Sequence, residues 1–250
     1  MKNIEVKVLN PEAVQTAKQM LVTCARLTQR GHTIKNMSDF DELMNKPFSD
    51  TLYESMVNLP HTTIQRFATI NMVIVGASRR FLAQITRAQV GVTFMSASLQ
   101  YSNYEHDANF VVPYNIMKVG VENAYLEVCK QSMNEYSNCM KIGIDNDEAG
   151  YQAPQGLRNV LVISANPLAW KQMISTRTCS RNTKETQYVM LRCWEALYKL
   201  DPILFSPKTT GPKCCREGKF SCKKPLINLT PTEIIKKLFP LLVEDNKNED

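Results

Sequence analysis

The chain has 250 residues, a formal net charge of +6 and 44% hydrophobic residues. This length suits one sizeable domain, and the near-average composition excludes collagen-like, low-complexity and largely disordered chains. No apolar run reaches the roughly 18 residues that a membrane span needs, and Met1–Asn10 lacks the apolar core of a signal peptide. We therefore expect a cytoplasmic protein without a membrane partner. The mild basic excess favours a phosphorylated ligand, but it is too dispersed for a nucleic-acid partner.

In chain order, the first predicted element is a helix over residues 13–27, which follows Asn10-Pro11 and ends near Gly31. A short helix is expected over 39–44. The mostly apolar stretch 62–77 is interpreted as a long buried helix, and 78–84 continues it or starts another. β-Branched and aromatic residues predict extended segments over 90–101 and 109–113.

The second half of the chain alternates further between the two kinds of element. The patterns predict helices over 116–140, 167–176, 182–200 and 230–243, and a strand over 157–165. This mixture predicts an α/β (α+β) fold with a mixed sheet flanked by long helices. We expect one domain over residues 1–205 and a Cys-bearing loop and helix extension over 206–250.

Eight cysteines are present, and without a secretion signal we expect them to be reduced. Cys214, Cys215 and Cys222 cluster, which is one way to hold a zinc ion. The cluster offers only three sulfurs and no nearby His. We therefore predict a basic surface loop with reduced thiols and no metal.

Two polar pairs stand at helical spacing. Gln84 and Arg87 are three residues apart, so they share a helix face that suits a planar, oxygen-rich ring; solvated surface is the plainer alternative. Arg177 and Arg181 are four apart, where like charges are destabilising by about 0.2–0.5 kcal/mol unless an anion offsets them. This spacing favours a phosphate or carboxylate partner, and the nearby Glu185 is one candidate.

The order and spacing of these groups resemble the flavin-dependent thymidylate synthase family. The family's signature is Arg-His-Arg, seven residues and Ser, preceded by Ser-Arg and by a Gln three residues before the first Arg. The matching stretch here runs from Ser78 through Gln84 and Arg87 and on to residues 98–101. His61-Thr62-Thr63 is similar to the family's His-containing helix start, and Asn166 precedes Arg177 by eleven residues, as in the family. The resemblance covers residues 15–200.

The resemblance implies a methyltransferase that converts dUMP to dTMP with methylenetetrahydrofolate and NADPH through reduced FAD. It also implies a homotetramer with active sites between subunits, and no cysteine nucleophile. By matching positions, the nucleotide ligands are Gln84, Arg87, Ser98, Gln100, Arg158 and Arg177. Arg177 is the catalytic residue among them, because it would stabilise negative charge on the uracil ring. The matching flavin contacts are Thr28, His61, Thr63, Gln89, Asn166, Gln172 and Arg181. A helix-capping or core role is the alternative for His61.

The chain also departs from the family pattern. Ala88 replaces the signature His and Gln89 the second Arg, eight residues separate Gln89 from Ser98, and Gln100 stands where an Arg usually holds the nucleotide phosphate. Ala cannot donate a hydrogen bond and Gln carries no charge, so binding of the flavin phosphate is weakened or rebuilt. Two alternatives stay open: a related pyrimidine-nucleotide modifying enzyme such as a hydroxymethylase, and a non-catalytic nucleotide- or nucleic-acid-binding homologue. The compact, divergent form suits a bacterial or phage-encoded protein.

Overall fold

A four-stranded sheet forms the centre of the computed structural model, which describes residues 1–106, 108–212, 218–223, 226 and 228–243. The strand order is β1-β2-β4-β3, with β1 (Glu5–Val8), β2 (Ile70–Ser78), β4 (Arg158–Ala165) and β3 (Val92–Ser96). All three pairings are antiparallel. The predicted α+β class is confirmed, and the expected mixed sheet is corrected to an antiparallel one.

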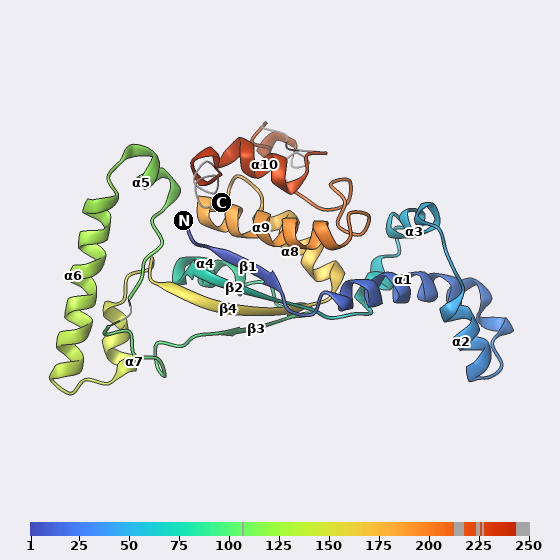
Figure 1. Ribbon diagram of the computed structural model, residues 1–250, viewed down its shortest axis with the longest axis horizontal. Coiled ribbons are helices and arrows are strands. Elements are labelled where there is room, and N and C mark those ends of the chain that lie inside the picture. The colour runs from blue at the N-terminus through green and yellow to red at the C-terminus, as the bar shows by residue number, and fades with distance from the viewer. Residues whose placement is uncertain (107, 213–217, 224–225, 227, 244–250) are drawn as a thin grey trace, which may run out of the picture.

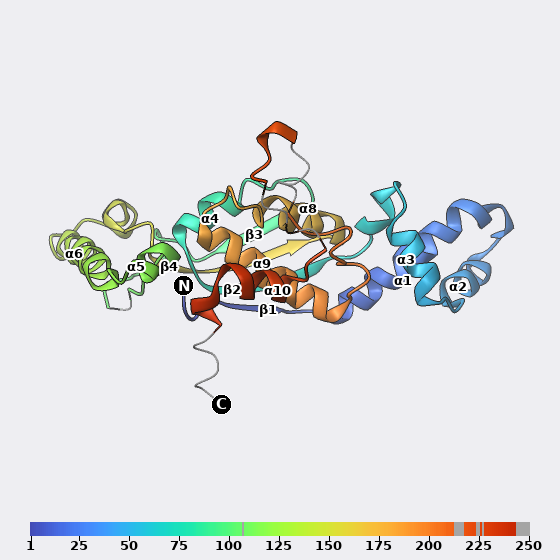
Figure 2. The same cartoon turned by 90° about the horizontal axis from the view of Figure 1, so that it is seen from above.

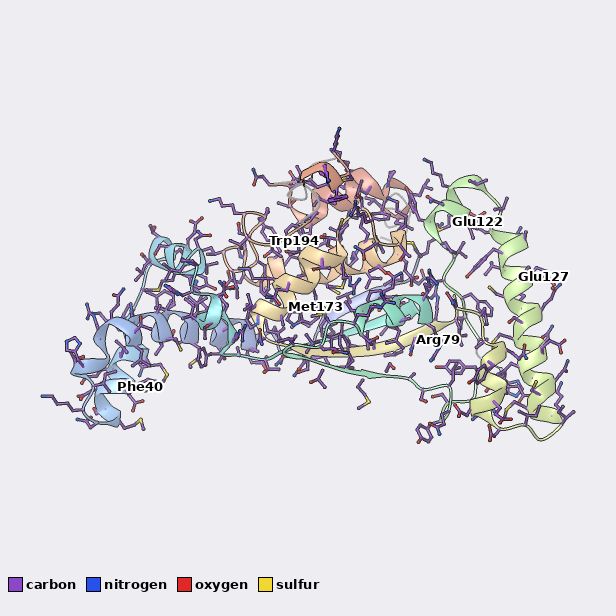
Figure 3. All side chains as sticks on the ribbon, turned by 180° about the vertical axis from the view of Figure 1, so that it is seen from behind. Phe40, Arg79, Glu122, Glu127, Met173 and Trp194 are labelled. Carbon is purple, nitrogen blue, oxygen red and sulfur yellow. The ribbon has the colours of Figure 1, made fainter. Side chains whose placement is uncertain are left out.

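Helices cover one face of this sheet (Figure 1). They are α4 (Arg79–Ile85), α8 (Pro167–Arg177) and α9 (Lys184–Leu200), with α10 (Pro231–Leu238) packed outside α9. Trp170 and Trp194 are fully buried in this layer, where their indole N–H groups donate to the carbonyls of Ile70 and Phe205. Figure 3 shows Trp194 inside the helical layer. Burial of large aromatic side chains with satisfied polar atoms makes this layer the main core of the protein.

Helical arms extend from the two ends of the sheet (Figure 2). One arm contains α1 (Glu12–Arg30), α2 (Met37–Asn45) and α3 (Asp50–Val57), and the other contains α5 (Tyr114–Val119), α6 (Glu122–Lys141) and α7 (Asn146–Ala149). Short 3₁₀ turns are η1 (Gly31–Thr33), η2 (Thr62–Arg66), η3 (Gly150–Gln152), η5 (Gly218–Phe220) and η6 (Pro240–Leu242). The helix expected over 116–140 is split, because Gly120 adopts a left-handed φ of 78° that ends α5 before α6 begins.

Most other predicted elements are confirmed. The helices expected over 13–27, 39–44, 78–84, 167–176, 182–200 and 230–243 correspond to α1, α2, α4, α8, α9 and α10 followed by η6. The extended segments over 90–101 and 157–165 contain β3 and β4, and the segment 109–113 makes a bridge from Phe110 to Leu157.

The long helix expected over 62–77 is wrong. The chain makes only the turn η2 and then enters β2, in which Ile70, Met72 and Ile74 are fully buried at every second position. Val73 and Val75, at alternating positions, are also apolar although they lie on the uncovered face of the sheet. This two-sided apolar pattern conceals the period of two that identifies a strand.

A β-bulge ends β2 beside the helical layer. The pairing shifts register between Val75 and Ala77, and the intervening Gly76 has a φ of 81°. A Cβ at Gly76 would lie 2.7 Å from the carbonyl oxygen of Asn3, so only glycine fits there. Ser78 follows and caps α4 by accepting a hydrogen bond from the backbone N–H of Phe81. The bulge therefore sets the direction in which the chain enters α4.

The second face of the sheet carries no helix in Figure 1. Val75, Val160 and Met95 on adjacent strands are 40%, 43% and 73% exposed. Neighbouring apolar side chains in such a position are typical of an interaction surface. We call the face that these residues form the open sheet face.

The described part of 206–250 shares the core of the rest of the chain. Phe239 packs edge-on against Tyr114 and Tyr188, with ring centroids 5.2 Å apart in both pairs. The division at residue 206 stays a prediction. Cys214 and Cys215 lie outside the described residues, and within the described ones no group of three His, Cys, Asp or Glu is placed to hold a metal. No helix in the described ranges is long and apolar enough to cross a membrane.

Candidate functional site

A cavity of about 520 Å³ opens between α4, the end of α8 and the start of α9. Its lining contains five arginines, Arg79, Arg80, Arg87, Arg177 and Arg181, and we call it the arginine cavity. The remaining lining residues are Ala83, Gln84, Gln155, Asn182 and Thr183. No carboxylate is among these described residues, so the cavity is strongly positive and suits an anionic ligand.

Three local features of the fold bring the predicted nucleotide ligands together. Gln84 lies on α4, Arg87 follows that helix, and Arg177 is the last residue of α8. The Oε1 atom of Gln84 accepts a hydrogen bond of 2.6 Å from the hydroxyl of Thr186 on α9. This bond fixes the amide and presents its NH₂ group as a donor.

Arg177 is positioned by the turn between α8 and α9. Its Nη1 atom lies 3.4 Å from the side-chain oxygen of Asn182, and the amide of Asn182 donates to the carbonyls of Thr176 and Cys179. Burial and then the positive charge of Arg87 lower the pKa of Arg177. The two guanidinium groups therefore repel each other, and an anion placed between them would relieve that repulsion.

A second cavity of about 270 Å³ shares Arg87 and Arg177 with the first. Gln89 and Gln172 contribute amides to it, and we call it the amide cavity. The other lining residues are Ala88, Val90, Val92, Ala169, Met173 and Thr176; Met173 and Arg79 are both labelled in Figure 3. Apolar walls with a few amides suit a flat heterocycle with polar edges.

A third cavity of about 470 Å³ adjoins the opposite side, sharing Arg80, Gln155 and Thr183 with the arginine cavity. Glu185 lines this third cavity and not the arginine cavity. Its carboxylate accepts hydrogen bonds of 2.7 Å and 2.6 Å from the backbone N–H and the hydroxyl of Ser78. Burial raises the pKa of Glu185, and these two bonds oppose that shift.

Four of the predicted residues lie near the cavities or along the sheet without lining either named cavity. Asn166 caps α8 by accepting from the backbone N–H of Ala169 at 2.9 Å. The hydroxyl of Ser98 accepts from the backbone N–H of Gln100 beyond β3. Arg158 lies at the start of β4, where its side chain donates to the carbonyls of Phe110 and Lys2.

The remaining predicted flavin contacts lie on α1 and at the turn η2. Thr28 is exposed near the end of α1, and His61 and Thr63 are exposed at η2. The turn η2 packs against both α1 and α8. In a single chain these three residues line neither the arginine cavity nor the amide cavity.

Arg79 and Arg80 were not among the predicted site residues. Arg80, Gln84 and Arg87 stand at positions i, i+4 and i+7, which lie on one helix face, so spacing alone could have added Arg80 to the set. No local pattern marks Arg79. Its Nη1 atom is buried and has no hydrogen-bond partner among the described residues.

The fold and the arginine cavity together define an α+β protein whose positively charged cavity suits an anionic ligand. Comparison with known proteins makes this more specific. The model of the family described as "Thymidylate synthase complementing protein" (Thy1) matches residues 11–203, and the chain belongs to this family. The predicted relationship to flavin-dependent thymidylate synthases is thereby confirmed.

Curated relatives agree at modest identity. A flavin-dependent thymidylate synthase of Pyrococcus abyssi is 29% identical over 168 residues, which span 63% of this chain and 67% of that protein. One of Thermococcus kodakarensis is 26% identical over 193 residues, spanning 74% and 75%. Among solved structures, the UMP/dUMP methylase PolB of Streptomyces cacaoi, bound with 5-Br dUMP, has a TM-score of 0.64 at 14% identity. That match covers 82% of this chain and 94% of PolB, and it shows a shared fold.

Proposed function

We propose that this chain is an enzyme that binds dUMP in the arginine cavity and methylates its uracil ring to give dTMP. The co-substrates are methylenetetrahydrofolate and NADPH, and the cofactor is FAD. One observation carries the proposal. Gln84, Arg87 and Arg177 were matched to the family's nucleotide ligands from sequence, and they line one cavity although Arg177 is ninety residues beyond Arg87.

Each of these side chains has a distinct task. The oriented amide of Gln84 and the guanidinium of Arg87 hold the nucleotide. Arg177 lies against the uracil ring and stabilises the negative charge that develops there. A preorganised donor of this kind contributes on the order of 3 kcal/mol to the transition state.

The residues of the amide cavity fit a flavin ring. Ala88, Val92 and Met173 offer apolar surface to the ring faces, and the amides of Gln89 and Gln172 match carbonyl and N–H groups at a ring edge. A bound flavin supplies the hydride and one-carbon chemistry. The cations among the described lining residues are Arg87 and Arg177, which the arginine cavity also uses. Placing the ring here puts it beside the nucleotide.

Several predicted ligand residues line neither cavity in a single chain. This favours a site that is completed by residues of a neighbouring copy. We place Thr28, His61 and Thr63 as flavin contacts, and Ser98 and Gln100 near the ribose, contributed by a neighbouring copy in a homotetramer. The open sheet face gives such a copy an apolar surface to cover. Arg158 is already bonded to two carbonyls, so it takes no direct part in this arrangement.

Tritium release tests the proposal directly. Full-length protein reconstituted with FAD should become yellow and release tritium from dUMP labelled at the uracil C5 position. Omission of either methylenetetrahydrofolate or NADPH should stop turnover. Protein that stays colourless with FAD and binds no dUMP would contradict the proposed function.

A related pyrimidine-nucleotide modifying enzyme is the second candidate. It is favoured by Ala88 in the wall of the amide cavity, where a side chain smaller than the family's His leaves space beside the flavin and nucleotide. Mass spectrometry of the product nucleotide separates the two, since a hydroxymethyl product is heavier than dTMP by one oxygen atom. The binding-only alternative rested on Ala88 in place of the signature His together with the basic segment 208–224, part of which lies outside the described residues.

A further inference from the structure

The arginine cavity has two distinguishable sides. Arg87 and Arg177 belong to the side that it shares with the amide cavity. Arg80 lies about two helical turns before Arg87, at the part of the cavity that is shared with the third cavity together with Gln155 and Thr183. If the uracil ring lies against Arg177 beside the flavin, the rest of the nucleotide extends toward Arg80. The cavity therefore has a direction that matches a base at one end and a phosphate at the other.

The guanidinium groups on the second side are suited to an anion. Arg80 donates from Nη1 to the neutral Oε1 atom of Gln155 at 2.8 Å, which orients the group without neutralising it. Arg79 Nη1 is buried and has no hydrogen-bond partner within the described ranges. An unsatisfied buried donor is destabilising, and a hydrogen bond to a phosphate oxygen would satisfy it. Guanidinium also matches phosphate geometry better than an ammonium group does.

The start of α9 lines this side through its capping residue Thr183 and the preceding Asn182. The first turn of α9 already holds the buried carboxylate of Glu185, which is bonded to Ser78, so the positive charge of this side comes from the arginines. By contrast, Gln100 carries no charge where the family pattern has an arginine for the phosphate, and neither it nor Ser98 lines the cavity.

We propose that Arg79 and Arg80 form the subsite for the 5′-phosphate of the pyrimidine nucleotide. Arg181 also lines the cavity, but its Nη2 atom donates at 2.6 Å to the carbonyl of Phe220. Base and phosphate are then held in one cavity of one chain, and the β3 end contacts the ribose alone. The inference rests on the proposed function for the identity of the ligand. It explains why five arginines converge where a nucleotide base needs only two.

Calorimetric titration of the full chain with dUMP and with deoxyuridine tests this subsite. Wild-type protein should bind dUMP at least tenfold more tightly than deoxyuridine, since about 1.4 kcal/mol corresponds to tenfold. Arg80→Gln should reduce that preference about tenfold or more and leave deoxyuridine affinity unchanged. The Arg80 side chain is exposed, so the variant is expected to fold. Arg79→Gln should lower the preference in the same direction.

Arg30→Gln is the matched control, because it removes the same charge from the exposed end of α1, and it should keep the wild-type preference. Gln100→Ala tests the position that the family uses for phosphate. Because Gln100 is placed near the ribose, this change should affect dUMP and deoxyuridine binding equally and leave their ratio unchanged. If Arg80→Gln retains the preference and Gln100→Ala loses it, the phosphate lies at the β3 end and the subsite is wrong.

The same titrations separate failure of the subsite from failure of the proposed function. Turnover of dUMP with normal phosphate preference in Arg80→Gln overturns the subsite alone. Wild-type protein that does not distinguish dUMP from deoxyuridine and releases no tritium overturns both.

Discussion

The arginine cavity and the start of β4 use the same side chain in opposite ways. At β4, Arg158 donates at 3.3 Å and 2.9 Å to the carbonyls of Phe110 and Lys2, so its guanidinium joins three distant segments. In the cavity, Arg79 Nη1 has no partner in the described part of the chain, and Arg177 reaches only a neutral amide at 3.4 Å. Arg181 also lines the cavity but donates at 2.6 Å to the carbonyl of Phe220, so the difference from Arg158 holds for Arg79 and Arg177. An arginine bonded to backbone carbonyls supports the fold, whereas arginines gathered without an anion are suited to an anionic ligand.

Arg177→Ala should have the largest effect on turnover, because Arg177 is expected to serve the ligand and not the fold. Loss of a preorganised charge donor is expected to lower kcat by about 10²–10³. The far-ultraviolet circular dichroism and Tm should stay near those of the wild type. Arg177→Lys should also be poor, because a point charge does not replace a planar fork. Near-wild-type tritium release by either variant would remove Arg177 from the mechanism.

Arg158→Ala should show the opposite pattern. The variant loses two charge-assisted hydrogen bonds between distant segments, so the free energy of unfolding should fall by about 1.5–3 kcal/mol. The Kd for dUMP measured on the folded variant should change little. Urea denaturation and dUMP titration on the same preparation check both parts. A stable variant with greatly weakened dUMP binding would return Arg158 to the nucleotide site.

The comparison also applies to Lys171, a buried cation that is held by a hydrogen bond within the fold. It is 6% exposed, donates at 3.0 Å to Gln65 of η2, and burial lowers its pKa to about 8. Between that value and an unfolded pKa near 10.4, the unfolded chain binds more protons than the folded chain. Stability contributed by this site should therefore rise with pH across this window, by at most about 1.4 kcal/mol per pH unit.

Replacement of this lysine provides the measurement. The free energy of unfolding of Lys171→Met should exceed that of the wild type at pH 7.5. The difference between the two free energies should narrow as the pH approaches 10. Urea denaturation of both proteins at several pH values follows the difference. Parallel stability profiles would mean that Lys171 has the same pKa in the folded and the unfolded chain.

Much of the candidate site could be predicted because its pattern is local. Gln84 and Arg87 are separated by one helical turn, and Asn166 and Arg177 stand at the two ends of a single helix. Such spacings survive folding because a helix preserves them. The role of Arg158 could not be predicted in this way, since its partners are 48 and 156 residues away in sequence.

There are also physical reasons why some strands and helices were not predicted from the sequence. The strand β1 is short and alternates Glu5 and Lys7 with valines at the edge of the sheet, so its apolar signal is weak. The strand β2 is apolar on both faces, which resembles a buried helix over a short window. The helix α3 was not predicted, although Ser49 caps it and Tyr53 and Val57 pack into the core at helical spacing.

The bulge at Gly76 has a consequence for the evolution of ligand binding in this chain. Successive strand residues point to opposite faces, so deleting this one residue would restore a continuous ladder and turn Ser78 away from Glu185. The following helix would then leave the sheet on the wrong side, and its amide and guanidinium groups would no longer converge with those of α8. Recognition of a charged ligand thus depends on a position that contributes no side chain at all.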